Sequence, residues 1–219
     1  ELKRVCHAME ISINEYLVSV YIWSVYTECL HGMPSKCPIR VAVPVNLRPY
    51  FNSITTKNFF VMVSAEFHPT KETYTFAEVA AIVKESLRSQ INRENLEKLF
   101  SYNVSNEKLL IARVVPLFLK NLAMKYVYTT SALANTATIT NIGNISVTEE
   151  YRPYVEMFHA FLAMSKGQHL KGTICSYGDT LVFSFSYDLV DASVQRGFFR
   201  KIASDGIAVE IKSNGVNYE

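Results

Sequence analysis

The chain has 219 residues, of which 49% are hydrophobic and 19% charged, which excludes a disordered polymer, a collagen-like repeat and a charged linker. Lys and Arg total 22 against 20 Asp and Glu, so a formal net charge of +2 gives no indication of a nucleic-acid partner. The four cysteines form no CxxC pair, which argues against a disulfide framework and a zinc site and favours reduced thiols in a cytoplasmic protein.

The length suits one large domain, and we expect residues 1–219 to form a single domain. The chain begins at Glu1 rather than Met and shows no secretory signal pattern, so we expect a fragment or a processed product. The most apolar window, residues 16–26, is well short of the ~20 apolar residues that a spanning helix needs. The sequence therefore predicts no membrane span.

Two capping boxes mark the clearest helix starts. Ser12 and Glu15 stand at capping-box spacing before a run that contains no Gly or Pro until Gly32. Apolar residues occupy nearly all sides of this helix, which predicts a central position covered from several directions. Thr75 and Glu78 repeat the spacing before a second helix. The predicted helices span residues 2–9, 12–31, 76–91, 93–102, 106–126 and 192–204, and Pro116 should kink or end the fifth of them.

The predicted strands carry β-branched and aromatic residues at alternating positions. In the first strand Pro44 removes a hydrogen-bond donor, which indicates a sheet edge or a bulge. Gly178 can supply the positive φ that a tight hairpin needs. The predicted strands span residues 39–47, 58–67, 137–140, 156–164, 170–177, 180–187 and 207–211. Together the elements predict an α/β fold, a two-layer sandwich with a mixed β-sheet covered by helices.

No common catalytic signature occurs in the sequence. HExxH, GxSxG, GxGxxG and a Gly-rich phosphate loop are all absent, and no metal site is predicted. The histidines have ordinary structural explanations near helix ends and in loops. His159 differs because it alternates with Phe158 and Ala160 in a predicted strand, so its side chain faces either solvent or a cleft. We keep His159 as a candidate site residue.

Polar groups end two of the predicted strands. Asn46 and Arg48 follow the first strand, and a covered Arg48 would need a carboxylate or carbonyl partner. Thr140, Asn141 and Gly143 form a second strand end, which can present hydroxyl, amide and backbone N–H groups to a substrate. Plain turn and strand-end structure explains both segments equally well from the residues alone.

Five stretches follow one another in an order known from one superfamily. Residues 11–17 are similar to its vTvNdyLla helix start, residues 43–48 to its vPvnlR strand and residues 57–59, which include Asn58, to its GN step. Residues 140–143 are similar to its sNlG segment, and residues 181–199 to its closing strand and helix. The sequence thus resembles the C-terminal half of the chloramphenicol-acetyltransferase-like superfamily of CoA-dependent acyltransferases, with bacterial alcohol acetyltransferases and condensation domains as the most similar members.

The resemblance implies an enzyme that moves an acyl group from a CoA or carrier thioester to a small-molecule alcohol or amine, with no tightly bound cofactor. In the superfamily, a His of an HHxxxDG motif in the N-terminal half acts as general base. That motif is absent here, so the resemblance implies a C-terminal subdomain that is inactive without its N-terminal partner.

The resemblance also assigns roles to the two strand ends. It places the segment from Thr140 to Gly143 close to the acyl thioester and gives a supporting role to the other strand end. Plant BAHD enzymes pair the corresponding arginine with an aspartate of a DFGWG motif, which this sequence lacks. The candidate substrate-binding residues are Thr140, Asn141, Gly143 and His159, and the candidate supporting residues are Asn46, Arg48 and Asn58.

Two other hypotheses remain open at this point. One is a non-catalytic binding or scaffolding domain that keeps the acyltransferase-like fold. The other is a complete small enzyme, which would have to self-associate to build a channel and would still lack the histidine motif.

Overall fold

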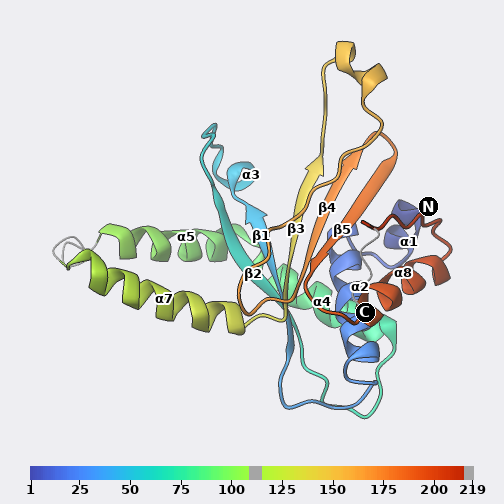
Figure 1. Ribbon diagram of the computed structural model, residues 1–219, viewed down its shortest axis with the longest axis horizontal. Helices are drawn as coiled ribbons and strands as arrows, with labels where there is room; N and C mark the ends of the chain where they lie inside the picture. The colour runs from blue at the N-terminus through green and yellow to red at the C-terminus, as the bar shows by residue number, and fades with distance from the viewer. Residues whose placement is uncertain (109–114, 215–219) are drawn as a thin grey trace.

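The computed structural model describes residues 1–108 and 115–214. They form a five-stranded mixed sheet in the order β2-β1-β3-β4-β5 with helices packed on one face, which confirms the predicted α/β fold (Figure 1). β1 pairs antiparallel with β2 and parallel with β3, whereas β4 pairs parallel with β3 and antiparallel with β5. The strands are β1 Ile39–Asn46, β2 Phe60–Phe67, β3 Ala137–Asn144, β4 Leu170–Tyr177 and β5 Thr180–Tyr187.

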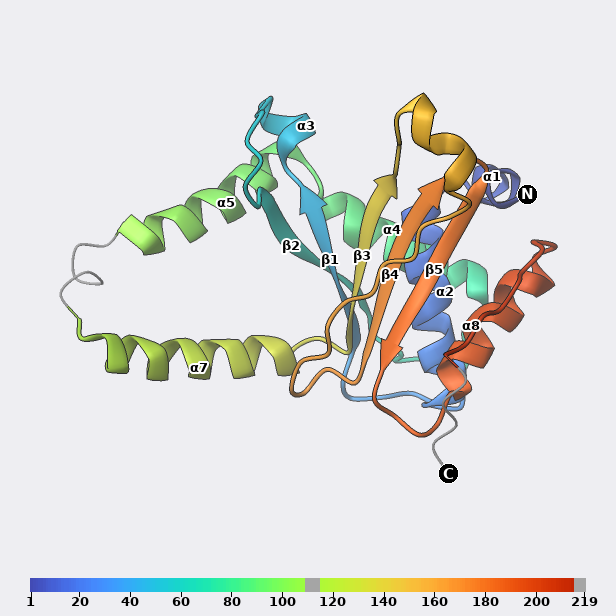
Figure 2. The same ribbon diagram turned by 45° about the horizontal axis from the view of Figure 1, so that its top comes forward.

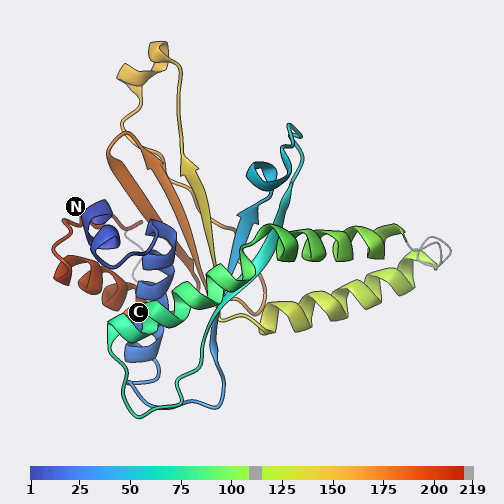
Figure 3. The same ribbon diagram turned by 180° about the vertical axis from the view of Figure 1, so that it is seen from behind.

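Helices α1, α2, α4 and α8 lie on one face of the sheet, whereas α5 and α7 project away from it beyond β2 (Figure 3). A 3-10 helix, η1, stands beyond the ends of β3 and β4 (Figure 1). The helices are α1 Leu2–Ala8, α2 Ile13–Glu28, α3 Arg48–Phe51, α4 Phe76–Gln90, α5 Arg93–Lys108, α7 Leu117–Leu133, η1 Glu149–Tyr154 and α8 Ser193–Ser204. None of the helices in the described ranges is long and apolar enough to cross a membrane.

Helix α2 is the centre of the core, as its all-round apolar pattern predicts. It packs against α4, α8 and β1, and its large side chains Tyr16, Tyr21 and Tyr26 are fully buried. Both predicted capping boxes are present, at the starts of α2 and α4. Burial by itself would raise the pKa of Glu15 in the first box, but hydrogen bonds from the Arg88 guanidinium and from Ser12 lower it. The Arg88 bond, 2.8 Å from Nε to Oε1, also joins α4 to α2.

Several sequence predictions differ from the structure. Residues 156–164 and 207–211 form no strand. Ala137 does begin a strand, but it continues to Asn144 because β4 pairs with it over that length. The predicted helix at 106–126 falls partly on residues 109–114, which lie outside the described residues, and α7 begins only after Pro116. Proline has no N–H to donate within a helix interior, so it is better tolerated at the start of a helix, where that N–H would have no partner.

The sheet divides between β1 and β3. β1 pairs with β3 only at Val41 and Ala42, whereas its pairing with β2 continues to Asn46. Pro44 belongs to an interior strand, but it lies in the stretch of β1 that has no β3 partner, where its missing N–H costs no ladder bond. Figure 2 shows β1 and β3 diverging toward the end of the sheet that carries α3. The polar strand ends predicted from the sequence flank this division.

Candidate functional site

A cleft of about 390 Å³ lies where β1 and β3 separate. One side is built from β1, β2 and the turn between them, and the other from β3 and a segment that follows η1. The lining combines amide, hydroxyl and guanidinium groups with apolar side chains: Pro44, Asn46, Arg48, Asn58, Phe59, Phe60, Met62, Thr138, Thr140, Asn141 and Leu162. A few convergent polar groups beside an apolar wall are typical of a small-molecule site. Because one molecule of liquid water occupies ~30 Å³, a cleft of this volume holds roughly a dozen non-hydrogen atoms.

Arg48 stabilises the wall formed by the β1–β2 turn. Its Nε donates to the carbonyl of Thr55 at 3.0 Å, and its Nη2 donates to the carbonyl of Lys57 at 2.7 Å. Its Nη1 donates to Asn46 Oδ1 at 3.2 Å, and the same oxygen accepts from the Arg48 backbone N–H at 3.1 Å. The partners of Arg48 are therefore carbonyl oxygens rather than a carboxylate. Because the guanidinium donates in three directions, it fixes the turn that precedes Asn58.

Asn141 and Gly143 form a bulge on the opposite wall. The pairing of β3 with β4 shifts between Asn141 and Gly143, so that one extra residue lies in β3. Gly143 has φ +85°, a left-handed conformation that glycine adopts without strain, and its N–H donates to Asn141 Oδ1 at 2.8 Å. That bond fixes the side-chain amide of Asn141, which lines the cleft, through its oxygen.

Leu162 closes the cleft from a segment that crosses β4. Lys171, a buried residue of β4, donates from Nζ to the carbonyl of Ala163 at 2.7 Å and to Ser165 Oγ at 2.6 Å. Cys175 donates from Sγ to the carbonyl of Phe158 at 3.1 Å. These side-chain bonds on both sides of Leu162 fix its position against the cleft.

The described lining of the cleft contains few ionisable side chains. Arg48 is the one charged side chain among the described residues that line it. No group of three or more metal-binding side chains occurs in the part of the chain that the structure describes. The cleft as built can bind and orient a neutral group, and it can donate hydrogen bonds, but its described lining supplies no general base.

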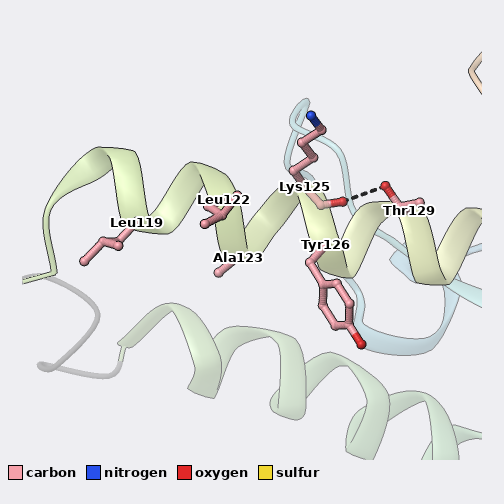
Figure 4. A pocket seen from close by; sticks show the side chains of 6 residues that line it. All are labelled: Leu119, Leu122, Ala123, Lys125, Tyr126 and Thr129. Carbon is pink, nitrogen blue, oxygen red and sulfur yellow. Dashed lines mark hydrogen bonds between the residues drawn. The ribbon is translucent and has the colours of Figure 1, made fainter.

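A larger hollow of about 620 Å³ lies along α7 (Figure 4). Leu119, Leu122, Ala123 and Tyr126 give it an apolar wall, and Tyr126 points toward the side on which α5 lies. Thr129 also lines the hollow, but its hydroxyl already donates a hydrogen bond within α7, from Oγ1 to the carbonyl of Lys125 at 2.8 Å. Convergent polar groups are lacking among the described residues of this hollow, so we place the candidate site at the divided sheet instead.

The structure brings together five of the seven candidate residues: Asn46, Arg48, Asn58, Thr140 and Asn141 all line the cleft. Gly143 acts through its backbone bond to Asn141, and His159 is exposed on the segment that crosses β4. Sequence reasoning missed the apolar wall, above all Phe60 and Met62, which are 48% and 45% exposed. Their signal was present: apolar residues occupy both alternating sets of β2, although only one set, Val61 and Val63, faces the core.

The chain matches no protein-family model and no curated protein. Solved structures do match. The epimerization domain from the third module of tyrocidine synthetase B has a TM-score of 0.56 at 13% identity, with 93% of this chain and 44% of that chain covered. The nonribosomal peptide synthetase FmoA3 with α-methyl-L-serine-AMP bound has a TM-score of 0.58 at 16% identity, with 94% and 21% covered.

The chain has a fold similar to part of the epimerization domain and to part of FmoA3. The similarity extends over nearly the whole chain, and the resemblance seen in the sequence is thereby confirmed at the level of the fold. The chain spans less than half the length of the epimerization domain, which is consistent with a C-terminal half.

Proposed function

We propose that this chain is the C-terminal subdomain of an acyltransferase that moves an acyl group from a CoA or carrier thioester to a small-molecule alcohol or amine. One observation carries the proposal: the divided sheet forms a cleft in which strand-end hydroxyl and amide donors lie beside an apolar wall. The fold similarity supports the superfamily, and the cleft supports the location of the site.

The proposed reaction assigns different steps to two subdomains. A general base of the N-terminal subdomain removes the proton from the acceptor O–H or N–H. The oxygen or nitrogen attacks the thioester carbonyl carbon, the C–S bond breaks, and the thiol leaves with the proton. In this chain, Asn141 Nδ2 and the Thr140 hydroxyl are the groups that can donate to the carbonyl oxygen as negative charge develops on it. Neither a metal nor a tightly bound cofactor takes part.

The remaining lining residues hold the substrates and the walls of the cleft. Phe60, Met62 and Leu162 offer apolar contacts to the acyl group or to the carbon skeleton of the acceptor. Asn46 and Arg48 support the opposite wall through the bonds that fix the β1–β2 turn, which leads to Asn58. This division of roles places the reacting atoms near Asn141.

The test is acyl transfer by the full-length protein as its gene encodes it, followed as thiol release from acyl-CoA in the presence of short alcohols and amines. Asn141→Ala should lower the turnover number roughly tenfold or more, because one hydrogen bond to a developing oxyanion is lost, with little change in melting temperature. Arg196→Ala, at an exposed side chain of α8, is the matched control and should leave turnover unchanged. Unchanged turnover together with a lowered melting temperature in Asn141→Ala would refute the functional role.

A non-catalytic binding domain is the second candidate, and one observation favours it. The described lining of the cleft contains no histidine, carboxylate, thiol or amine that could act as a base. A binding domain would take up an acyl thioester without consuming it. Saturable binding of acyl-CoA by the full-length protein, with no thiol release for any acceptor, would select this candidate.

A further inference from the structure

Helix α7 leaves much of its apolar surface uncovered. Together with α5 it forms an arm that projects away from the sheet beyond β2 (Figures 1 and 3). Eight of its large apolar and aromatic side chains are 45–72% exposed: Leu117, Phe118, Leu119, Leu122, Met124, Tyr126, Val127 and Tyr128. By contrast, the apolar residues Val79, Val83 and Leu87 of α4 are buried in the core. An exposed apolar surface of this extent is typical of a site that binds another protein or a membrane.

The exposed residues of α7 lie on two opposite sides of the helix. Tyr126 and its neighbours line the hollow on the side where α5 lies (Figure 4). Two positions along a helix correspond to more than half a turn, so Met124 and Tyr128 point roughly away from Tyr126. Leu117 and Val127 share their side, because they lie two turns before Met124 and nearly one turn after it. We call these four residues the outer side of α7, and they are 52–71% exposed.

The charged residues of α7 are both positive. Lys120 and Lys125 carry its charge, and the sequence contains no Asp or Glu from residue 115 to residue 148. Lys120 lies three residues after Leu117 and four before Met124, so it belongs to the outer side. Its stem can follow the apolar surface while the ammonium group reaches polar surroundings. Apolar and aromatic residues combined with lysines are typical of a helix that lies on a membrane with anionic lipids.

The polar side chains of α7 also suit an environment with little water. The Thr129 hydroxyl donates to the carbonyl of Lys125 at 2.8 Å, and the Thr130 hydroxyl donates to the carbonyl of Tyr126 at 3.0 Å. A hydroxyl that is already hydrogen-bonded within its helix costs less to remove from water. Tyr128 combines an apolar ring with a polar hydroxyl, which favours the level of the lipid headgroups.

We propose that α7 docks with its outer side on the surface of a lipid membrane that contains anionic lipids. The helix has 17 residues, a length of about 25 Å, and would lie within the interface. It would not cross the bilayer, since no described helix is long and apolar enough to do so. The anionic headgroups supply the negative charge that α7 lacks, and a bilayer can accept an apolar side over its whole length. The inference does not depend on acyl transfer.

Helix α5 connects the arm to the wall of the cleft. Phe100 of α5 packs edge-on against Phe59, with 5.3 Å between the ring centroids, and Phe59 lines the cleft. Arg93, at the start of α5, lies over the ring of Phe51 at 5.9 Å. Phe51 in turn contacts Phe59. A docked arm would therefore hold the cleft at a fixed place relative to the lipid surface.

Co-sedimentation of the full-length protein with vesicles tests the proposal. The protein should bind vesicles of phosphatidylcholine mixed with phosphatidylglycerol roughly tenfold or more tightly than vesicles of phosphatidylcholine alone, because two lysines face the anionic surface. Added salt should weaken this binding. The double variant with Lys120→Gln and Lys125→Gln should bind both kinds of vesicle equally weakly. Failure of the wild-type protein to bind the mixed vesicles, or equal binding to both kinds, would overturn the proposal.

Two valine substitutions give a matched pair. Val127 on the outer side is 52% exposed and Val190, in the loop before α8, is 74% exposed, so both variants to Glu should keep the wild-type melting temperature. Val127→Glu should weaken binding to the mixed vesicles roughly tenfold or more, whereas Val190→Glu should bind as the wild type does. Equal vesicle binding by the two variants would contradict docking through α7.

The same pair distinguishes a membrane from a protein partner. A second subdomain or a second copy that covers the outer side would make Val127→Glu lower the melting temperature of the full-length protein, or dissociate an oligomer, without any vesicles present. Either result would overturn membrane docking and identify a protein interface. Acyl transfer is not among these measurements, so their failure leaves the proposed function unaffected.

Discussion

Replacing Arg48 by methionine should release the wall formed by the β1–β2 turn. The guanidinium donates three hydrogen bonds, at 3.0, 2.7 and 3.2 Å, to the carbonyls of Thr55 and Lys57 and to Asn46. Each such bond contributes about 0.5–1 kcal/mol net when it is partly exposed, so Arg48→Met should lower the free energy of unfolding by about 1–3 kcal/mol. For a chain of this size the melting temperature should fall by about 2–12 °C.

Urea unfolding measures the stability, and hydrogen exchange of residues 55–58 measures the turn itself. Arg48→Lys keeps the charge but reaches only one acceptor at a time, so its effect should be about half that of Arg48→Met. Arg196→Met is the control, since the Arg196 side chain is 65% exposed and its Nη2 lies 3.7 Å from Asp191 Oδ1. If Arg48→Met leaves both the urea midpoint and the exchange of the turn unchanged, the three bonds do not hold this wall and the reasoning is refuted.

Three further outcomes follow from packing and charge. The Phe198 ring is fully buried, and its centroid lies 4.4 Å from that of Phe183. Phe198→Ala should therefore lower the free energy of unfolding, measured in urea, by about 3–5 kcal/mol. A loss under about 1 kcal/mol would contradict the place of Phe198 in the core. Gly172→Ala should cost about 1–3 kcal/mol, because the added Cβ would lie 2.7 Å from Phe183 Cζ, and a wild-type urea midpoint would show that the ring can move. Hydrogen bonds from Thr75 and Lys71 lower the pKa of Glu78 from 4.5 to about 2, so the stability that its charge contributes is present above pH 4.5 and lost as the pH falls toward 2. Glu78→Gln should flatten that part of the profile of melting temperature against pH. An unchanged profile would argue against the capping box.

Local signals predicted most of the fold because they are properties of single elements. The capping boxes at Ser12 and Thr75 locate the starts of α2 and α4 to within one residue. Gly178, with φ +57°, lies in the tight turn between β4 and β5, as the hairpin prediction requires. These features depend on neighbours in the sequence, so the sequence carries them directly.

The errors fall where structure depends on distant partners. Alternation predicted a strand at residues 156–164, and the structure retains the alternation but supplies no partner strand among the described residues. A ladder needs two strands, and periodicity in one of them cannot supply the second. The same limit applies to Pro44, whose missing donor indicated an edge, while the local division from β3 depends on residues about 95 positions away.

The candidate site was predictable in its polar part and not in its apolar part. Asn46, Arg48 and Asn141 stood out because polar groups and a permissive glycine end two strands there. Leu162 had no such signal, because its place at the cleft depends on bonds from Lys171 and Cys175 to its neighbours. Sequence patterns find groups that are unusual for their own element, whereas a wall built from ordinary apolar residues requires the fold.

The central claim is that this chain is one wall of an acyl-transfer cleft and that a second subdomain supplies the base. The most direct test is the intact mass of the protein as its source cell makes it, together with peptide sequencing of its N-terminal part. The account predicts a longer polypeptide that carries roughly another 200 residues with an HHxxxDG motif. A native polypeptide that begins near Glu1, with no separate chain carrying that motif in the purified complex, would contradict it.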